Sequence, residues 1–233
     1  GGKSLYPYSS CGSVATKVSF NRPYKRYAEP LCNPDPFVDA WNGAGEFFSP
    51  LGGGSPGWEY NMVRWLEQEG YDVTYATNID VHTNPSLLDS HNAMLSLGHD
   101  EYWTGEMRRH IEQARDRGLH LGIFSSNTCY WQMRLEPSRL TGEPDRTMVA
   151  YKENTPWHDP LSTDRDPEND HLVTTRWRSA PVNRPEADLL GSMYIEVDHP
   201  VDGDFVIQDA EPWLLAKTGL SRGALLPGVA GHE

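Results

Sequence analysis

The sequence predicts an α/β fold in which helices cover a parallel β-sheet. Two short apolar runs, residues 93–97 and 119–124, are typical of buried strands. One stretch with helical spacing and capping residues lies at 55–70, and a second lies between the two runs. Because strands that alternate with helices of this length build parallel sheets, this is the fold class that we expect.

The first elements follow one another along the chain. Residues 1–57 are rich in Gly, Pro and aromatic residues and are predicted to be mostly ordered loop, with a short strand at 18–20. A helix is predicted over 55–70, because Ser and Pro are suited to its start and Gly ends it. Residues 71–78, "YDVTYATN", are predicted to form a strand, and a polar segment then leads to the strand at 93–97.

A second helix is predicted to begin at the cap Thr104 and to end at Gly118. Met107 and Ile111 belong to its apolar stripe, which is expected to face the sheet. The strand at 119–124 follows directly. This order is typical of flavodoxin-like sheets, in which ligands bind beyond the carboxyl ends of the strands.

The regular pattern ends after Met148. Residues 151–172 are acidic and contain proline, so we expect a loop insertion or lid with solvated acidic side chains. Short strands are predicted at 191–197, 204–208 and 212–217.

These elements are expected to form one α/β catalytic domain over 1–233. It would comprise a loop-rich segment at about 1–57, a sheet core at about 58–150, and a loop and β elaboration at about 151–233. Because neither end has a polar tail or a cap signal, we expect the chain to be part of a longer one.

Composition excludes several classes of protein. With 233 residues, 37% of them hydrophobic, the chain can bury a sizeable core. Its formal net charge of −13 argues against non-specific binding to nucleic acid or to an anionic membrane. It has no apolar run long enough to span a membrane and no signal-peptide pattern at residues 1–10. The cysteines, Cys11, Cys32 and Cys129, are too few for a disulfide framework, which favours reduced thiols in the cytoplasm. A bridge between Cys11 and Cys32 stays open.

Polar residues follow both central strands without a spacer. Glu101, in "GHDEYW", is suited to bind a metal or to act as a general base, or it only complements the dipole of the following helix. His99 is a second candidate, against the alternative of an exposed or core histidine. In "SNTCYWQ", Asn127 is expected to hydrogen-bond a substrate carbonyl or to fix a ligand. Cys129 is either a nucleophile with His99 as its base or a small buried hydrophobe.

Six stretches of the chain carry a family resemblance. They are "GGKSLYPYSS", "KVSFNRPY", "LSLGHDEYW", "IFSSNTCYWQMRLEPS", "RTMVAYK" and "NRPEADLLG". Together they resemble the C-terminal catalytic region of the large (beta) subunit of N,N-dimethylformamidase and its relatives, nearly from end to end. The resemblance implies a hydrolase of C–N bonds in small N-substituted formamides, on a class I glutamine-amidotransferase-like α/β domain. It also implies a mononuclear iron ion (Fe³⁺) held by two tyrosines and one glutamate.

The resemblance assigns roles to individual residues. Glu101 is similar to the carboxylate ligand of the iron and Tyr24, in "NRPY", to one phenolate ligand. His99, Asn127 and Glu233 resemble the surrounding catalytic polar residues. The second tyrosine is expected upstream of "GGKSLY", and Tyr6 and Tyr8 are the nearby substitutes.

The family also suggests a small partner subunit and a homo-oligomer. Two alternatives to the iron-dependent hydrolase stay open: a metal-free thiol enzyme that uses Cys129, and a non-catalytic binding module on the same fold.

Overall fold

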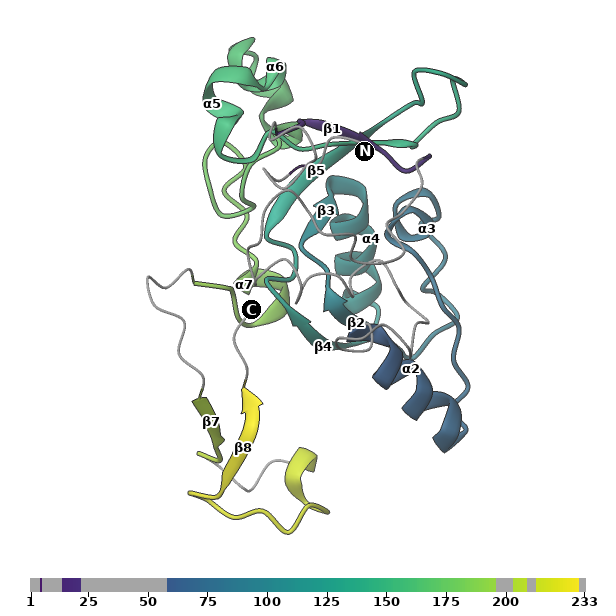
Figure 1. Cartoon of the computed structure of the whole chain (residues 1–233), viewed down its shortest axis with the longest axis vertical. Helices are drawn as coiled ribbons and strands as arrows, with labels where there is room; N and C mark the ends of the chain where they lie inside the picture. Colours follow the sequence, from purple (N-terminus) through teal and green to yellow (C-terminus); the bar gives the residue numbers. More distant parts are fainter. Residues whose placement is uncertain (1–4, 6–13, 22–57, 196–202, 209–212, 231–233) are drawn as a thin grey trace, which may run out of the picture. The chain divides into compact units, whose positions relative to one another are not determined.

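The computed structural model describes residues 5, 14–21, 58–195, 203–208 and 213–230 (Figure 1). It is a mixed α/β structure that divides into two compact units, residues 1–194 and 195–233. Within the described part of the chain, no helix is both long and apolar enough to cross a membrane. The prediction of a single catalytic domain stays a prediction, as does the flavodoxin-like and glutamine-amidotransferase-like assignment.

Two parallel strands of the first unit form a sheet of their own. β2 (Ala93–His99) and β4 (His120–Ser126) pair in parallel along their full length, from Ala93 opposite His120 to His99 opposite Ser126. The apolar runs of the sequence therefore form the strands that were predicted, with the predicted parallel direction.

Each central strand continues, after a short break, into a second strand. β3 (Tyr102–Thr104) follows β2, and β5 (Trp131–Glu136) follows β4. These two strands also pair in parallel, with Tyr102 opposite Trp131. The second sheet is mixed, because β6 (Thr147–Val149) and β1 (Lys17–Ser19) add antiparallel strands in the order β1-β6-β5-β3.

Local signals mark the start of α4 and the ends of α2 and α4. Gly70, with φ of 74°, follows α2, and Gly118, with φ of 108°, follows α4. The side chain of Thr104 caps α4 by accepting a hydrogen bond from the Met107 backbone N–H at 3.1 Å. The bounds are α2 (Trp58–Glu69), α3 (Asn78–Thr83), α4 (Gly105–Asp116), α5 (Thr155–His158), α6 (Pro160–Thr163) and α7 (Ala187–Leu190).

The predicted strand at 71–78 is wrong, because residues 71–77 are irregular and Asn78 begins α3. Thr77 and Asp80 form a reciprocal capping box, which commits the end of the segment to a helix. Tyr75 is half exposed and donates a hydrogen bond from Oη to Glu67 at 2.8 Å. The β-prone residues of this segment therefore have no neighbouring strand among the described residues.

The acidic segment at 151–172 is not a plain loop. It folds into α5, α6 and two 3₁₀ turns, η2 (Lys152–Asn154) and η3 (Pro167–Leu172). Asp159 is completely buried, and both its carboxylate oxygens bond to the Arg134 guanidinium, at 2.9 and 3.0 Å. The expectation that the acidic side chains are all solvated is therefore wrong, because one of them anchors the segment to β5.

The second unit contains the antiparallel strands β7 (Gly203–Val206) and β8 (Leu225–Ala230) and the 3₁₀ turn η4 (Trp213–Leu215). The strand predicted at 204–208 corresponds to β7, whereas the predicted strand at 212–217 is wrong. Trp213 is 85% exposed there, and the Thr218 hydroxyl closes the turn by donating to the Leu215 carbonyl at 2.8 Å. The described part of the predicted strand at 191–197, residues 191–195, is irregular.

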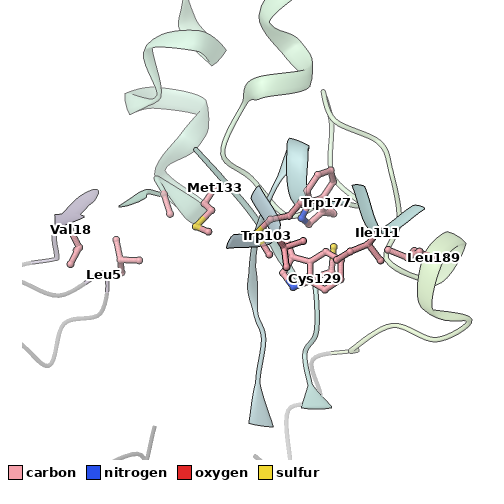
Figure 2. Packing of buried hydrophobic residues seen from close by; sticks show 11 residues of the cluster. Leu5, Val18, Trp103, Ile111, Cys129, Met133, Trp177 and Leu189 are labelled. Atoms are coloured by element: carbon pink, nitrogen blue, oxygen red, sulfur yellow. The ribbon is translucent and has the colours of Figure 1, made fainter. Parts of the chain in front are cut away.

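The core of the first unit lies where β3, β5 and α4 meet. Figure 2 shows Cys129 beside Trp103 and near Ile111 and Trp177, all of them buried. Arg108 of α4 is 1% exposed, and its guanidinium lies 4.7 Å from the centre of the Trp177 ring. Its Nη1 and Nη2 donate to the backbone carbonyls of Arg184 and Pro185 at 2.6 and 2.9 Å. This buried charge is thus hydrogen-bonded, as burial of a guanidinium requires.

Candidate functional site

The two breaks between the parallel strands lie side by side, and we call them together the strand junction, residues 100–101 and 127–130. The Cys129 N–H donates to the Asp100 carbonyl at 2.9 Å, and the Trp131 N–H donates to the Glu101 carbonyl at 2.9 Å. These bonds join the chain after β2 to the chain after β4. The main chains of the two polar clusters seen in the sequence are therefore adjacent.

The two sides of the strand junction differ in length. Two residues separate His99 from Tyr102, whereas four residues separate their partners Ser126 and Trp131. The longer side accommodates its extra residues through left-handed backbone at Asn127, with φ of 37°, and at Cys129, with φ of 56°. Such conformations are uncommon for residues other than glycine and often occur at functional sites.

Glu101 is a buried carboxylate at this junction, since the residue is 9% exposed. Lys152 lies near enough for the charge of Glu101 to influence its ammonium group. Burial lowers the pKa of Lys152, while the carboxylates of Glu101 and Glu153 work in the opposite direction. Glu101 is thus held in a shielded place beside a cation, where Coulomb interactions are stronger than in water.

Lys152 is a site residue that the sequence reasoning missed. Its Nζ donates to the Tyr102 hydroxyl at 3.2 Å and lies 5.5 Å from the centre of the Trp131 ring. Its φ of 58° is left-handed, which an ordinary surface lysine does not need. The only signal in the sequence was its place in the stretch "RTMVAYK", since no local pattern brings it to residues that lie 50 positions away.

Asn127 and Thr128 provide two buried oxygens on the longer side of the junction. Neither Asn127 Oδ1 nor Thr128 Oγ1 has a hydrogen-bond partner within the described structure. A buried polar atom without a partner costs about 1–3 kcal/mol, so such atoms commonly meet a ligand or water. An unpartnered acceptor oxygen fits the prediction that Asn127 fixes a ligand, whereas a bond to a substrate carbonyl would need its Nδ2 group as the donor.

Cys129 has the environment of a small hydrophobe. Its side chain is fully buried in the core shown in Figure 2. Burial raises the pKa of its thiol well above the ordinary value, against an opposing effect of the Arg108 charge. A catalytic cysteine needs the reverse, an accessible thiol with a lowered pKa. The buried-hydrophobe interpretation therefore accounts for Cys129 better than the nucleophile interpretation.

Asp100 precedes Glu101 and holds the junction through its carboxylate. Its Oδ2 accepts a hydrogen bond from Ser96 Oγ at 2.7 Å and its Oδ1 accepts one from Asn78 Nδ2 at 2.9 Å. The residue is partly accessible, but neighbouring atoms enclose its carboxyl group. This burial raises the pKa of Asp100, and the hydrogen bonds only partly offset the effect.

Several predicted site residues cannot be placed. His99 ends β2 opposite Ser126, but its side chain lies outside the described structure. Tyr24 and Glu233, like Tyr6 and Tyr8, also lie outside the described residues. Within the described ranges, no group of three or more His, Cys, Asp or Glu side chains could hold a metal ion. The ligand set of two tyrosines and Glu101 stays a prediction.

Comparison with known families agrees with the resemblance seen in the sequence. The family described as N,N-dimethylformamidase beta subunit-like, C-terminal, matches residues 1–233. Comparison with individually curated proteins gave no match. Since the family match extends over every residue of the sequence, the chain belongs to the N,N-dimethylformamidase beta subunit-like, C-terminal family.

Proposed function

We propose that this protein is an iron-dependent hydrolase that cleaves the C–N bond of small N-substituted formamides. The family name supports a hydrolase of the dimethylformamidase type. The observation that carries the proposal is the strand junction, where the buried carboxylate of Glu101 lies on a chain segment bonded to the one that bears the unpartnered oxygen of Asn127.

Glu101 fits the role of an iron ligand on chemical grounds. A carboxylate is a hard oxygen donor, and the phenolate of Tyr24 would be a second donor of the same kind. The main chain of Glu101 is fixed by the bond from Trp131, which restricts where its carboxylate can lie. Bound iron would supply positive charge that polarises the substrate carbonyl and lowers the pKa of a water molecule.

The other residues would bind the substrate and move protons. Hydrolysis forms a bond from the water oxygen to the carbonyl carbon and breaks the C–N bond, so that one proton must reach the leaving amine. We assign this proton transfer to His99 or Glu233, which resemble the catalytic polar residues of the family. Asn127 would donate from its side-chain Nδ2 to the substrate carbonyl oxygen and stabilise the developing oxyanion, a role worth about 2.7–4 kcal/mol for comparable donors.

Lys152 would contribute charge to this site. Its ammonium group opposes the negative charge of Glu101, which favours the ionised carboxylate in a buried place. Its ammonium group donates a hydrogen bond to Tyr102 of β3 and lies near the ring of Trp131 of β5. These two contacts hold it beside the parallel pair β3 and β5.

We further propose that the protein acts in an assembly with a second subunit. The family description names a beta subunit, and such a name implies at least one other chain. We also propose that several copies of this assembly associate into a homo-oligomer. Sedimentation of the purified complex would test this.

The substitution Glu101→Gln tests the proposed function. It keeps the size and hydrogen-bonding capacity of the side chain but removes the charge that a ligand needs, so both iron and hydrolysis should be lost. The matched control is Glu106→Gln, since Glu106 lies in the first turn of α4 with its side chain 46% exposed and interacts with the helix dipole. The measurements are iron content by mass spectrometry and release of amine from N,N-dimethylformamide. Full iron occupancy in the Glu101→Gln protein would refute the assignment.

Tyr24→Phe gives an independent test of the same site. A phenolate bound to ferric iron absorbs visible light, and phenylalanine cannot replace that oxygen. The absorption band of the iron-loaded protein should therefore weaken in this variant, because one of the two proposed phenolate ligands is lost. A band of unchanged intensity would assign the phenolate ligand to another tyrosine.

A further inference from the structure

We propose that Asp100 is a positioning residue for Glu101, which it holds in place through a hydrogen-bond network across the strand junction. This inference rests on the proposed function, because that function gives Glu101 its role. The network consists of Asp100 itself, Asn78 at the start of α3, Ser96 within β2 and Ser125 within β4.

The side chain of Asp100 gathers two donors from different elements. Ser96 Oγ donates to one carboxylate oxygen at 2.7 Å, and Asn78 Nδ2 donates to the other at 2.9 Å. Ser96 is 3% exposed, so the bond that it makes is shielded from water. The carboxylate thereby ties the beginning of α3 to the middle of β2.

The main chain of Asp100 is held on both sides as well. Its N–H donates to Ser125 Oγ at 3.2 Å, and its carbonyl accepts from the Cys129 N–H at 2.9 Å. Two side-chain bonds and two main-chain bonds therefore fix the residue that directly precedes Glu101.

Asn78 extends the network to the far side of Glu101. The same Nδ2 that bonds to Asp100 lies 3.4 Å from the Tyr102 carbonyl. One amide group therefore contacts the residue before Glu101 and the residue after it. Because the Glu101 carbonyl also accepts from the Trp131 N–H at 2.9 Å, the backbone of this short segment has little freedom to move.

The chemistry of the junction explains why an aspartate is present. Since the two sides differ in length, the regular ladder of backbone hydrogen bonds cannot continue across the break, and side chains must satisfy the remaining groups. A carboxylate accepts from two donors at once, whereas asparagine offers one acceptor oxygen and a donor group. Asp100→Asn should therefore keep the bond from Asn78 but lose the charge-assisted bond from Ser96, whose hydroxyl would have to accept from the new amide group instead.

Residues that hydrogen-bond to a metal-binding residue and orient it have a measurable effect on the affinity for the metal. Loss of such an outer hydrogen-bond partner typically weakens metal binding or activity about 10–100-fold. Replacing a residue that has only a structural role would lower the stability of the protein but would not selectively weaken its affinity for the metal.

The experiment compares Ser96→Ala and Asp100→Asn with the matched control Ser138→Ala. Ser138 is also buried, at 7% exposure, and its Oγ accepts hydrogen bonds from the Leu140 and Thr141 N–H groups. All three changes remove or alter one buried polar group, but only the first two touch the network. Two quantities are measured: the affinity for Fe³⁺ in competition with citrate, and the hydrogen-exchange rates of the Cys129 and Trp131 amides by NMR.

Ser96→Ala and Asp100→Asn should each bind Fe³⁺ about 10–100-fold more weakly than the unmodified protein and exchange both amides faster. Ser138→Ala should change neither quantity. Exchange rates equal to those of the control would overturn the positioning role, whatever the iron result. Faster exchange with unaltered iron affinity would also overturn it, since Asp100 would then be structural only. Absence of Fe³⁺ binding in a protein that also carries the expected upstream tyrosine would instead refute the proposed function, and the exchange rates would still decide whether the network fixes the junction.

Discussion

Replacing Asp159 by alanine should strongly destabilise the protein, although Asp159 belongs to an acidic and otherwise largely exposed segment. The carboxylate is completely buried and accepts two hydrogen bonds from Arg134. It also accepts from the N–H and the hydroxyl of Thr174, at 2.9 and 2.8 Å. Alanine would leave the guanidinium and the buried Thr174 N–H without these partners.

The size of the effect follows from burial on both sides of the ion pair. Removing one partner of a buried, hydrogen-bonded pair typically costs about 3–5 kcal/mol. Because the Arg134 side chain is 16% exposed and still donates to the Leu172 carbonyl at 2.8 Å, we expect the lower half of that range. For a protein of this size, each kcal/mol lowers Tm by about 2–4 °C, so Asp159→Ala should lower Tm by roughly 6–16 °C.

The pH dependence provides a second check with a defined sign. Burial works to raise the pKa of Asp159, but the hydrogen bonds from Arg134 and Thr174 and the Arg134 charge together lower it below the ordinary value. Since the folded pKa is lower than the unfolded one, this stabilisation is complete above the unfolded pKa and is lost as the pH falls through the folded pKa. The difference in stability between the Asp159→Ala protein and the unmodified protein should therefore shrink below about pH 4.

The assay is thermal unfolding followed by circular dichroism at pH 7 and at pH 3, with Glu168→Ala as control. Glu168 is an exposed carboxylate in the same segment, and its loss should change stability by no more than about 0.5 kcal/mol. If Asp159→Ala lowered Tm at pH 7 no more than Glu168→Ala does, the reasoning from the buried pair would be refuted.

Three further outcomes are expected. Cys129 should react slowly with iodoacetamide in the native protein and rapidly in urea, because its thiol is buried and its pKa is raised; rapid native labelling, followed by mass spectrometry of its peptide, would contradict this. Lys152→Met should lower formamide hydrolysis about 10–100-fold without loss of stability, as measured by steady-state kinetics and thermal unfolding; full activity would exclude a role for the ammonium group beside Glu101. Thr104→Ala should cost about 1–2 kcal/mol in urea unfolding because it removes the cap of α4, whereas Thr104→Ser should cost less; equal costs would show that the hydroxyl is not the cause.

Elements whose signals are local could be predicted from the sequence. The strands at 93–97 and 119–124 were predictable because short continuous apolar runs favour strands, and α4 because Thr104 and Gly118 mark its ends. The expected burial of these strands is wrong in part, since Leu95 and Phe124 are exposed. The false strand at 71–78 shows the limit of this approach. Its residues favour extended structure, but a strand also needs a partner, and the partner is a tertiary property.

The candidate site was predictable only in part, for the same reason. The sequence predicted that the residues after the two parallel strands would meet, and their backbones are indeed hydrogen-bonded. It did not predict that Lys152 lies beside Tyr102, or that Asp159 binds Arg134, because each contact joins segments that are 50 and 25 residues apart in the sequence. Charge and composition predict solvated acidic loops on average, and only a specific buried donor reverses that expectation.

The unequal lengths of the strand junction also determine which insertions and deletions the chain can tolerate. Side chains alternate between the two faces of a strand, so Trp131 and Met133 occupy one face of β5 and Gln132 and Arg134 the other. The longer side exceeds the shorter by an even number of residues, which keeps this alternation in phase across both sheets. A deletion of one residue from 127–130 that shifts β5 by one position along β3 would exchange its two faces and turn Arg134 away from Asp159, whereas a shift by two positions would preserve the faces. Length changes at this position should therefore be tolerated when they shift β5 by an even number of positions, whatever their size.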